Sequence, residues 1–461
     1  MTVGIADLPR QHPDNAYTID PAEVGAMQLA AVRERFEALR PRIRVLESVA
    51  ADVGIDRIDA LEDVVPLCFP HTLYKSYSAG HIAKGRFDRL TEWLDGFTVH
   101  DLSGIDTSRC DSLESWLGAV EQGSDLRPTV TSGTTGKISF FPRSTTEADI
   151  FARLVVQALA GFGDEPDSGL DTGEPEWFSP LPIATGRQGM ARMFDLIRRH
   201  CYGGDATRIH TLGRGHWDAD MLWVWGRMRQ AEARGETAQL ELTPALERVR
   251  AQVIEAQQSA ARDTDRFLEE LSVEFRGRRV ILFGPTGTLI NLAGICRDRG
   301  LAPEFGPDTF ILAGGGNKGQ AFPSGWQELL YGVFPKPHAE VYAMTEITAL
   351  CRLCSAGWFH WSPTVVTFLI DPDTSEPLPR TGVQTGRLAL FDLCATTYWG
   401  GAVSGDRVTI DWDGGCPCGR TGARVRNDVT RYSDLRDDDK ITCAKSPGAY
   451  ERAVDTVVGL T

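Results

Sequence analysis

The chain has 461 residues, of which 42% are apolar and 24% charged, and its formal net charge is −15 with an isoelectric point near 5.1. The length and the ordinary apolar fraction exclude a disordered or fibrous protein and predict a globular protein of two or three domains. The negative charge repels phosphates and anionic lipid, so nucleic acid and membrane surfaces are not expected as partners.

No signal peptide is recognised at the N-terminus, and no stretch approaches the roughly 18 apolar residues of a membrane helix. A cytoplasmic protein is therefore expected. Ten cysteines are too sparse for a disulfide scaffold in a chain of this length. Two pairs of cysteines lie close together in the sequence, Cys351 with Cys354 and Cys416 with Cys418. These pairs are instead candidate metal ligands.

The first part of the chain is predicted to be mainly helical. Residues 22–53 carry apolar side chains at helical spacing, and Pro41 is predicted to separate two helices. The segment 61–77, LEDVVPLCFPHTLYKSY, follows as a turn-rich stretch. Residues 1–125 are therefore predicted to form an N-terminal helical arm and the first part of the core.

Residues 127–144, RPTVTSGTTGKISFFPRS, form a loop rich in Ser, Thr and Gly. Its glycines let backbone N–H groups approach an oxyanion, its hydroxyls can donate, and its lysine adds positive charge. A Walker A loop is disfavoured because Gly133 and Gly136 enclose only two residues and Ile138 follows Lys137. A solvated hairpin turn is the competing interpretation. The candidate phosphate ligands are Thr131, Ser132, Gly133, Thr134, Thr135, Gly136 and Lys137.

Helices and strands alternate along the rest of the chain. A Ser or Thr cap and acidic residues in the first turn predict a helix at 144–163. A helical insertion is predicted at about 200–277, before a strand at 278–285. Further strands, each bounded by Gly, Pro or Asp, are predicted at 309–313, 339–343, 364–370, 387–391 and 407–411. This alternation predicts an α/β fold.

Together with the loop, three later segments resemble, in order, the motifs of the adenylate-forming superfamily. That superfamily includes acyl-CoA synthetases, luciferases and peptide-synthetase adenylation domains. ILAGGGNKG (311–319) resembles its adenine-contacting glycine segment, VYAMTE (341–346) its aromatic-x-x-Thr-Glu motif, and SGD (404–406) its ribose-binding Gly-Asp. The resemblance implies a large multi-layer domain with mixed sheets flanked by helices, binding ATP or AMP. The core would span 126–430.

Each segment has a physical reason to hold part of a nucleotide. Glycines let bare backbone lie against a purine, and Tyr342 can stack on the base. Thr345 can donate to the α-phosphate, Glu346 offers hard oxygen to Mg²⁺, and Asp406 can accept from both ribose hydroxyls. Taken singly, each segment also has a structural alternative. The glycines could form a strand-ending turn, the Thr-Glu a helix cap and the Gly-Asp an ordinary turn. The predicted ligands in these segments are Gly314, Gly315, Gly316, Tyr342, Ala343, Met344, Thr345 and Asp406.

Within the superfamily the chain resembles the phenylacetate-CoA ligase-like branch most. The likeness lies in 61–77, in HWSPTVVTFLIDPDTSEPLPRTGVQTGRLAL (360–390) and in CPCGRTGARV (416–425), and it covers roughly residues 20–450. Zinc-bearing members of that branch place a Cys and a His before the Cys-x-Cys-Gly-Arg. The resemblance thus implies a structural zinc subregion at 351–420.

The implied zinc ligands form a closed Cys₃His set, which suits Zn²⁺ because thiolates are soft donors. They are Cys354, His360, Cys416 and Cys418. Cys351 competes with Cys354 for the first position, and the spacing from the Thr-Glu motif favours Cys354. Unrelated buried cysteines are the structural alternative.

The carboxylate pocket and the hinge are less strongly marked. Where relatives keep an aromatic or histidine gate, 178–190 has no matching residue, and Phe178 and Met344 are predicted as pocket walls, although either type is more often core. Relatives continue past a hinge arginine into a mobile C-terminal domain. Here 431–461 is expected to be the hinge and a vestigial segment, with Arg431 or Arg436 as the hinge arginine. No counterpart of the family's late lysine is assigned.

The resemblance implies an AMP-forming ligase that activates a carboxylic acid to an acyl-adenylate. Its catalytic residues would be Thr345, Glu346, Lys137 and the hinge arginine, with ATP and Mg²⁺ bound. The branch favours an aromatic acid such as a hydroxy- or aminobenzoate, and the acceptor could be CoA, a carrier-protein thiol, an amine or a hydroxyl. The alternatives are a nucleotide-binding scaffold with degenerate catalysis and a CoA-independent ligase forming amides or esters. A homodimer is left open.

Overall fold

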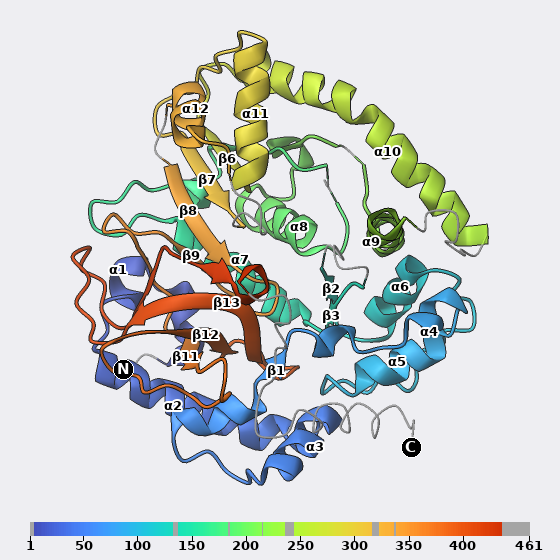
Figure 1. Ribbon diagram of the computed structural model, residues 1–461, viewed down its shortest axis with the longest axis vertical. Helices are drawn as coiled ribbons and strands as arrows, with labels where there is room; N and C mark the ends of the chain where they lie inside the picture. The colour runs from blue at the N-terminus through green and yellow to red at the C-terminus, as the bar shows by residue number, and fades with distance from the viewer. Residues whose placement is uncertain are drawn as a thin grey trace.

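The computed structural model describes residues 4–131, 137–182, 185–213, 215–235, 244–315, 322–335 and 338–435. Within them a six-stranded and a seven-stranded sheet lie in different parts of the molecule, and helices flank both (Figure 1). The predicted α/β fold with mixed sheets and flanking helices is confirmed. None of the helices in these ranges combines the length and the apolarity that crossing a bilayer requires.

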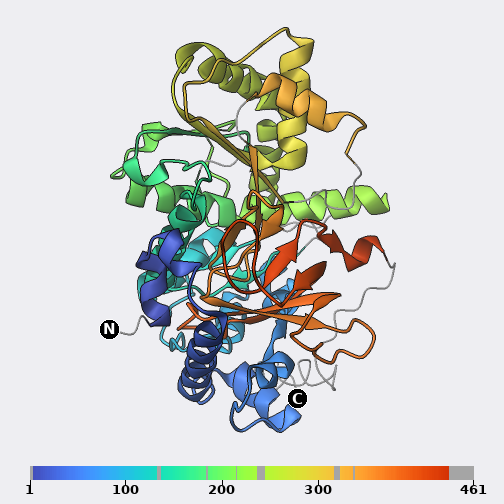
Figure 2. The ribbon, with the colours of Figure 1, turned by 90° about the vertical axis from the view of Figure 1, so that its left-hand side faces the viewer.

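The first helices confirm the predicted break at proline. Helix α2 (Pro21–Leu39) begins after Asp20, whose carboxylate accepts the backbone N–H groups of residues 22 and 23, and Pro21 occupies the first turn. Helix α3 (Arg44–Val53) ends at Gly54, which has a left-handed φ of 71°. After the short α1 (Pro13–Ala16), these helices pack under the seven-stranded sheet (Figures 1 and 2). Helices α4 (Ala79–Ala83), α5 (Phe87–Asp95) and α6 (Leu113–Gly123) lie to one side, at the right of Figure 1, and contribute to the same core.

The six-stranded sheet has the order β5-β4-β6-β7-β8-β9 and is parallel except for its last pair. Its strands are β4 (Glu176–Ser179), β5 (Ile209–Thr211), β6 (Val280–Pro285), β7 (Phe310–Gly314), β8 (His338–Ala343) and β9 (Leu350–Arg352). The predicted strands at 278–285, 309–313 and 339–343 are confirmed. The carboxyl ends of β7 and β8 lie side by side, the usual place for ligands in open α/β sheets.

Both faces of this sheet are covered, so alternate residues of one strand enter different cores. Ile281 and Phe283 pack toward α7 (Thr145–Leu159) and α8 (Gly189–Cys201). Val280 and Leu282 pack toward α10 (Pro244–Glu269), α11 (Thr286–Asp298) and α12 (Trp326–Val333). The predicted helix at 144–163 is confirmed as α7. Ser144 and Glu147 form its capping box, in which each side chain bonds the backbone N–H of the other residue.

The segment 200–277 contains two long helices, α9 (Ala219–Arg234) and α10 (Pro244–Glu269), which pack on each other. It also contains β5, a short parallel edge strand that the prediction of an all-helical insertion omitted. A strand of three residues is too short to show a recognisable alternation of apolar and polar side chains, and the sequence that follows it is helix-rich.

The seven-stranded sheet is antiparallel along β10-β14-β13-β12-β11, and β1 and β15 also pair with β13. Its strands are β1 (Phe69–Pro70), β10 (Trp358–Phe359), β11 (Val365–Ile370), β12 (Val383–Asp392), β13 (Gly401–Asp411), β14 (Arg424–Arg426) and β15 (Thr430–Arg431). The predicted strands at 364–370, 387–391 and 407–411 are confirmed. Residues 404–406 lie inside β13, so the Gly-Asp is not in a turn.

Candidate functional site

Part of the predicted phosphate loop lies in the structure and part lies outside it. Seven predicted ligands or hinge residues fall outside the described residues, namely Ser132, Gly133, Thr134, Thr135, Gly136, Gly316 and Arg436. The loop connects β2 (Thr129–Val130) with β3 (Phe140–Phe141), an antiparallel pair. At its base, Thr131 donates its backbone N–H to Ser139, and its hydroxyl accepts the N–H of Ser139 at 2.9 Å.

The Lys137 ammonium group is held by backbone carbonyls. Its Nζ donates to the Tyr77 carbonyl at 2.9 Å and more weakly to the Lys75 carbonyl at 3.4 Å, and it lies 5.4 Å from the centre of the Tyr77 ring. An ammonium group has three N–H donors. One donor therefore remains for a further acceptor, such as a phosphate oxygen.

The glycine segment ends β7. A Cβ at Gly314 would lie 2.7 Å from the Val341 side chain and 2.9 Å from the Val341 carbonyl oxygen, so the pairing of β7 with β8 requires glycine there. Gly315 follows with a φ of +79°, a conformation that glycine adopts at little cost. Strand packing and backbone conformation thus explain these two glycines, and Gly314 lies opposite Val341, the residue before Tyr342.

The tyrosine and the predicted ribose ligand are in direct contact. The Tyr342 hydroxyl donates to Asp406 Oδ2 at 2.7 Å, and the Nε of Arg431 lies 3.4 Å from Asp406 Oδ1. Strand pairing fixes the second contact, because Asp406 of β13 lies opposite Arg431 of β15. The Tyr342 ring also packs 5.5 Å from Trp361. Each carboxylate oxygen has a second lone pair, so Asp406 can still accept hydrogen bonds.

The Thr-Glu motif lies between α8 and a buried arginine. Arg143, only 5% exposed, donates to the Thr345 carbonyl at 2.7 Å. A Cβ on Gly189, the first residue of α8, would lie 3.6 Å from the Thr345 hydroxyl oxygen. The Thr345 hydroxyl therefore lies beside a helix N-terminus, where backbone N–H groups favour anions.

Charges of both signs surround Glu346. Burial raises the pKa of Glu346, and nearby Asp406 acts in the same direction, whereas Arg431 and Arg143 oppose the shift. Burial also lowers the pKa of Lys75, with Glu346 opposing and Lys137 reinforcing the shift. The structure thus brings Glu346, Asp406, Arg431 and the two lysines into one electrostatic neighbourhood.

Sequence reasoning missed Lys75, Arg143 and the N-terminus of α8. Arg143 stood inside the quoted loop, but its role depends on Thr345, which is 202 positions away in the chain. Next to it the fully buried Glu147 accepts the N–H groups of Thr396 and Thr397 at 2.6 and 2.8 Å. The only local signal was the Ser-x-x-Glu pattern of the α7 cap. These contacts tie the loop, α7 and the second sheet together.

One predicted pocket wall is a core residue. Phe178 is fully buried, stacks on His210 with ring centres 4.2 Å apart, and contacts Phe267 of α10 edge-on. Its side chain is on the α10 face of the sheet, so the prediction that it walls an open pocket is corrected. Met344 is half-buried beside Tyr342 against the second sheet, and Ala343 is exposed.

The four predicted zinc ligands lie together. Their nearest ligand atoms are within 4.8 Å of one another in Cys354, His360, Cys416 and Cys418. Cys351 points elsewhere, because its sulfur donates to the Tyr342 carbonyl at 3.4 Å. The Sγ atoms of Cys354 and Cys416 are 3.8 Å apart, and Cys418 Sγ is 3.6 Å from His360 Nε2.

These two distances match the edges of a zinc tetrahedron. Zn–S bonds of about 2.3 Å and Zn–N bonds of about 2.0–2.1 Å give edges of roughly 3.8 Å for S–S and 3.6 Å for S–N. Burial lowers the pKa of His360 to about 3, which keeps the ring neutral and able to ligate. Although burial alone would raise it, the pKa of Cys418 is lowered because N–H groups of Arg420 donate to its sulfur. The donor set therefore fits zinc.

Comparisons with solved structures give the fold. A 2-hydroxyisobutyryl-CoA ligase, in complex with 2-HIB-AMP and CoA, matches with a TM-score of 0.52 and 13% identity over 93% of this chain and 78% of its own. A malonyl-CoA ligase with methylmalonyl-CoA and AMP bound (TM-score 0.34, 15% identity, 70% of this chain and 56% of that one) and the amide bond synthetase McbA from Marinactinospora thermotolerans (0.32, 16%, 64% and 47%) match more weakly.

The chain spans about half the length of these last two proteins. No family model matches the sequence, and no curated protein matches it. The likeness over 93% of the chain shows that it shares the fold of the 2-hydroxyisobutyryl-CoA ligase.

Proposed function

We propose that the protein activates a carboxylic acid with ATP, releasing pyrophosphate and holding an acyl-adenylate. The observation that carries the proposal is the convergence of four side chains near the carboxyl ends of β7 and β8, namely Tyr342, Glu346, Asp406 and Arg431. The positive charge of Lys137 acts in the same neighbourhood, through its effect on Lys75. Distant parts of the chain supply these groups, and each suits a different part of ATP. The likeness in fold to an acid-CoA ligase supports the same reaction class.

In the proposed reaction a carboxylate oxygen of the acid attacks the α-phosphorus of ATP, and the bond from that phosphorus to pyrophosphate breaks. Asp406 would accept hydrogen bonds from the ribose, and the backbone at 314–315 would lie along the adenine. The free donor of Lys137 and the Thr345 hydroxyl would bind phosphate oxygens. Because two anions must meet, orientation and charge neutralisation supply the rate enhancement.

Glu346 suits Mg²⁺ as the second charge-neutralising group. Burial is the main cause of the raised pKa of its carboxyl group, and nearby Asp406 adds to the shift. Mg²⁺ commonly binds one or two carboxylates together with substrate phosphates. When bound, it would offset the charge that develops on the phosphate oxygens. The proposed hinge arginine is Arg431 or Arg436, and of the two Arg431 of β15 is the one seen beside Asp406.

The finer assignments rest on the sequence resemblance. We propose an aromatic acid, such as a hydroxy- or aminobenzoate, and membership of the phenylacetate-CoA ligase-like branch. The acceptor that releases AMP would be CoA, a carrier thiol, an amine or a hydroxyl. We also propose that Cys354, His360, Cys416 and Cys418 hold a structural Zn²⁺, which would tie the β9–β10 region to the loop before β14.

Carboxylate-dependent exchange of labelled pyrophosphate into ATP tests the proposed activity. We expect exchange that requires both Mg²⁺ and an acid, with aromatic acids the most effective members of a panel that also contains aliphatic acids. The control is the same assay without acid. If AMP binds but no acid in the panel supports exchange, the protein is a nucleotide-binding scaffold and the proposal is wrong.

A further inference from the structure

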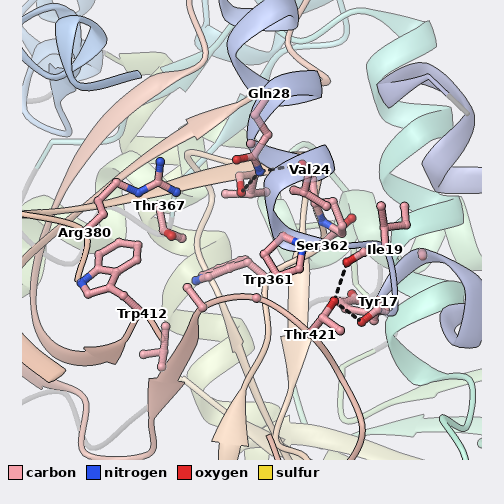
Figure 3. Close-up of a pocket in the computed structure, with 18 of the residues that line it drawn as sticks. Tyr17, Ile19, Val24, Gln28, Trp361, Ser362, Thr367, Arg380, Trp412 and Thr421 are labelled. Atoms are coloured by element: carbon pink, nitrogen blue, oxygen red, sulfur yellow. Dashed lines mark hydrogen bonds between the residues drawn. The ribbon is translucent and has the colours of Figure 1, made fainter. Parts of the chain in front are cut away.

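A cavity of about 320 Å³ lies between the N-terminal helices and the seven-stranded sheet, apart from the proposed nucleotide ligands. Figure 3 shows its two ends: Arg380, Thr367 and Trp412 gather at one, and Tyr17, Ile19 and Thr421 at the other, with Trp361 between them. Helix α2 closes it from above through Val24 and Gln28. The residues that we propose as nucleotide ligands do not line this cavity, although Trp361 of its wall packs against Tyr342.

Three residues of the cavity wall carry buried N–H donors that lack acceptors. Trp361 is only 8% exposed, and its indole N–H is buried without a hydrogen-bond partner. The indole N–H of Trp412 and the Nε–H of Arg380 are buried and unpartnered in the same way. Leaving a buried donor unpaired is costly, and native proteins contain few such groups. Three on the walls of one cavity indicate an acceptor that the protein does not itself supply.

Two other polar side chains of the walls, Gln28 and Thr421, already have partners. The Gln28 amide donates to the carbonyls of Pro363 and Val365 at 2.9 and 3.3 Å. The Thr421 hydroxyl donates to the carbonyls of Tyr17 and Ile19, the second at 2.7 Å. The unpartnered donors therefore belong to Arg380 and Trp412 at one end of the cavity and to Trp361 in its middle.

Arg380 also brings a charge that is not neutralised locally. Its guanidinium carbon lies 5.1 Å from the centre of the Trp412 ring and 5.6 Å from that of Phe368, and within the described residues it forms no hydrogen bond or ion pair. Contact with ring faces leaves the in-plane N–H groups free. Burial lowers the pKa of Arg380, and the exposed Glu62 on the cavity wall partly offsets this shift. Glu62 does not form an ion pair with the guanidinium.

We propose that this cavity binds a small monocarboxylate with a planar, apolar body. The carboxylate would accept from Arg380 and the Trp361 indole, since a guanidinium fork matches carboxylate geometry. The body would lie along the indoles and Val24. At the ~30 Å³ that a water molecule occupies in the liquid, the cavity has room for roughly ten non-hydrogen atoms. The proposal rests on this cavity alone and is independent of the proposed adenylation.

The probe is 4-fluorobenzoate, observed by ¹⁹F NMR with the full-length protein and compared with neutral 4-fluorobenzamide. We expect a bound signal for the acid that is lost in Arg380→Gln and weakened roughly tenfold in Trp361→Phe, which keeps the ring and removes the donor. Trp223→Phe is the matched control, because its indole N–H is also buried and unpartnered but lies outside the cavity. It should bind like the wild type.

Acid binding in the cavity is distinguished from acid binding at the proposed nucleotide site by comparing one variant of each site. Glu346→Gln should keep the bound signal, whereas a signal lost in Glu346→Gln and kept in Arg380→Gln would place the acid in the nucleotide cleft and overturn the proposal. Equal binding of the amide, or no bound signal at millimolar acid, would also overturn it. Arg380→Lys retains the charge, so it should bind more tightly than Arg380→Gln if both variants keep the wild-type melting temperature.

Discussion

Replacement of Glu346 by Gln should lower acid-dependent pyrophosphate exchange by roughly 100-fold or more, the usual cost of removing one group that neutralises charge in a transition state. The substitution removes the charge and keeps the shape, so the fold should be preserved. Binding of AMP without Mg²⁺ should change little, because Asp406 and Tyr342 remain. Exchange rates and AMP titrations on the same preparation measure the two effects separately.

The pH dependence gives the same residue a second readout. Burial raises the pKa of Glu346 above its ordinary value of 4.5, so the ionised form is lost at a higher pH than for an exposed glutamate. The wild-type rate should therefore fall on the acid side as pH drops through that raised value, and this limb should be absent from the residual activity of the variant. Glu328→Gln, on the exposed side of α12, is the control. Wild-type exchange in Glu346→Gln would remove the magnesium assignment.

Purified protein should contain one zinc per chain, and Cys418→Ser should contain little. The four ligand atoms are buried or half-buried, so an empty site leaves thiols and an imidazole packed without their partner. Loss of the metal should lower the melting temperature by roughly 5–10 °C, as expected when a few kcal/mol are lost from a domain of this size class. Elemental analysis and thermal unfolding, with and without a chelator, measure both quantities.

Cys110→Ser is the matched control for this experiment. Cys110 is a half-buried free cysteine outside the cluster, so its substitution should change neither the zinc content nor the effect of the chelator. Equal, near-zero metal in the wild type and in Cys418→Ser, with equal melting temperatures, would show that the cluster is only a group of thiols near a histidine.

Much of the fold could be predicted because local patterns agreed with the final structure. The Ser144 and Glu147 capping box marks the start of α7 in any context, since both bonds lie within one turn. The apolar runs of β6, β7 and β11 are buried on both faces, which makes each run uninterrupted and easy to recognise. Pro41 separated α2 from α3 as its missing N–H requires.

The same burial explains the failure at Phe178. All four residues of β4 are buried, so alternation gives no indication of which face of the sheet a side chain occupies. Trp177 packs toward α7 and α8, and Phe178 packs toward α10. A sequence that is apolar on both faces cannot distinguish the two, and the pocket assignment depended on that distinction.

The candidate site was partly accessible from the sequence. Tyr342 is the last residue but one of β8, Glu346 follows that strand, and Gly314 ends β7, so the position of parallel strand ends was enough to bring their segments together. Asp406 reaches Tyr342 from the second sheet, and the motif resemblance alone supplied that link. Arg143 and Lys75 could not be predicted, because their approach to the Thr-Glu motif depends on how the N-terminal half packs on the sheets.

Transfer of oxygen from the acid to AMP tests the central claim most directly. An acid labelled with ¹⁸O in its carboxylate is incubated with ATP, Mg²⁺ and an acceptor amine or thiol, and the AMP is analysed by mass spectrometry. If the carboxylate attacks the α-phosphorus at the Glu346 site, the bridging oxygen stays on phosphorus when the acyl group leaves, so AMP should carry one ¹⁸O. Unlabelled AMP, or ADP as the nucleotide product, would contradict it.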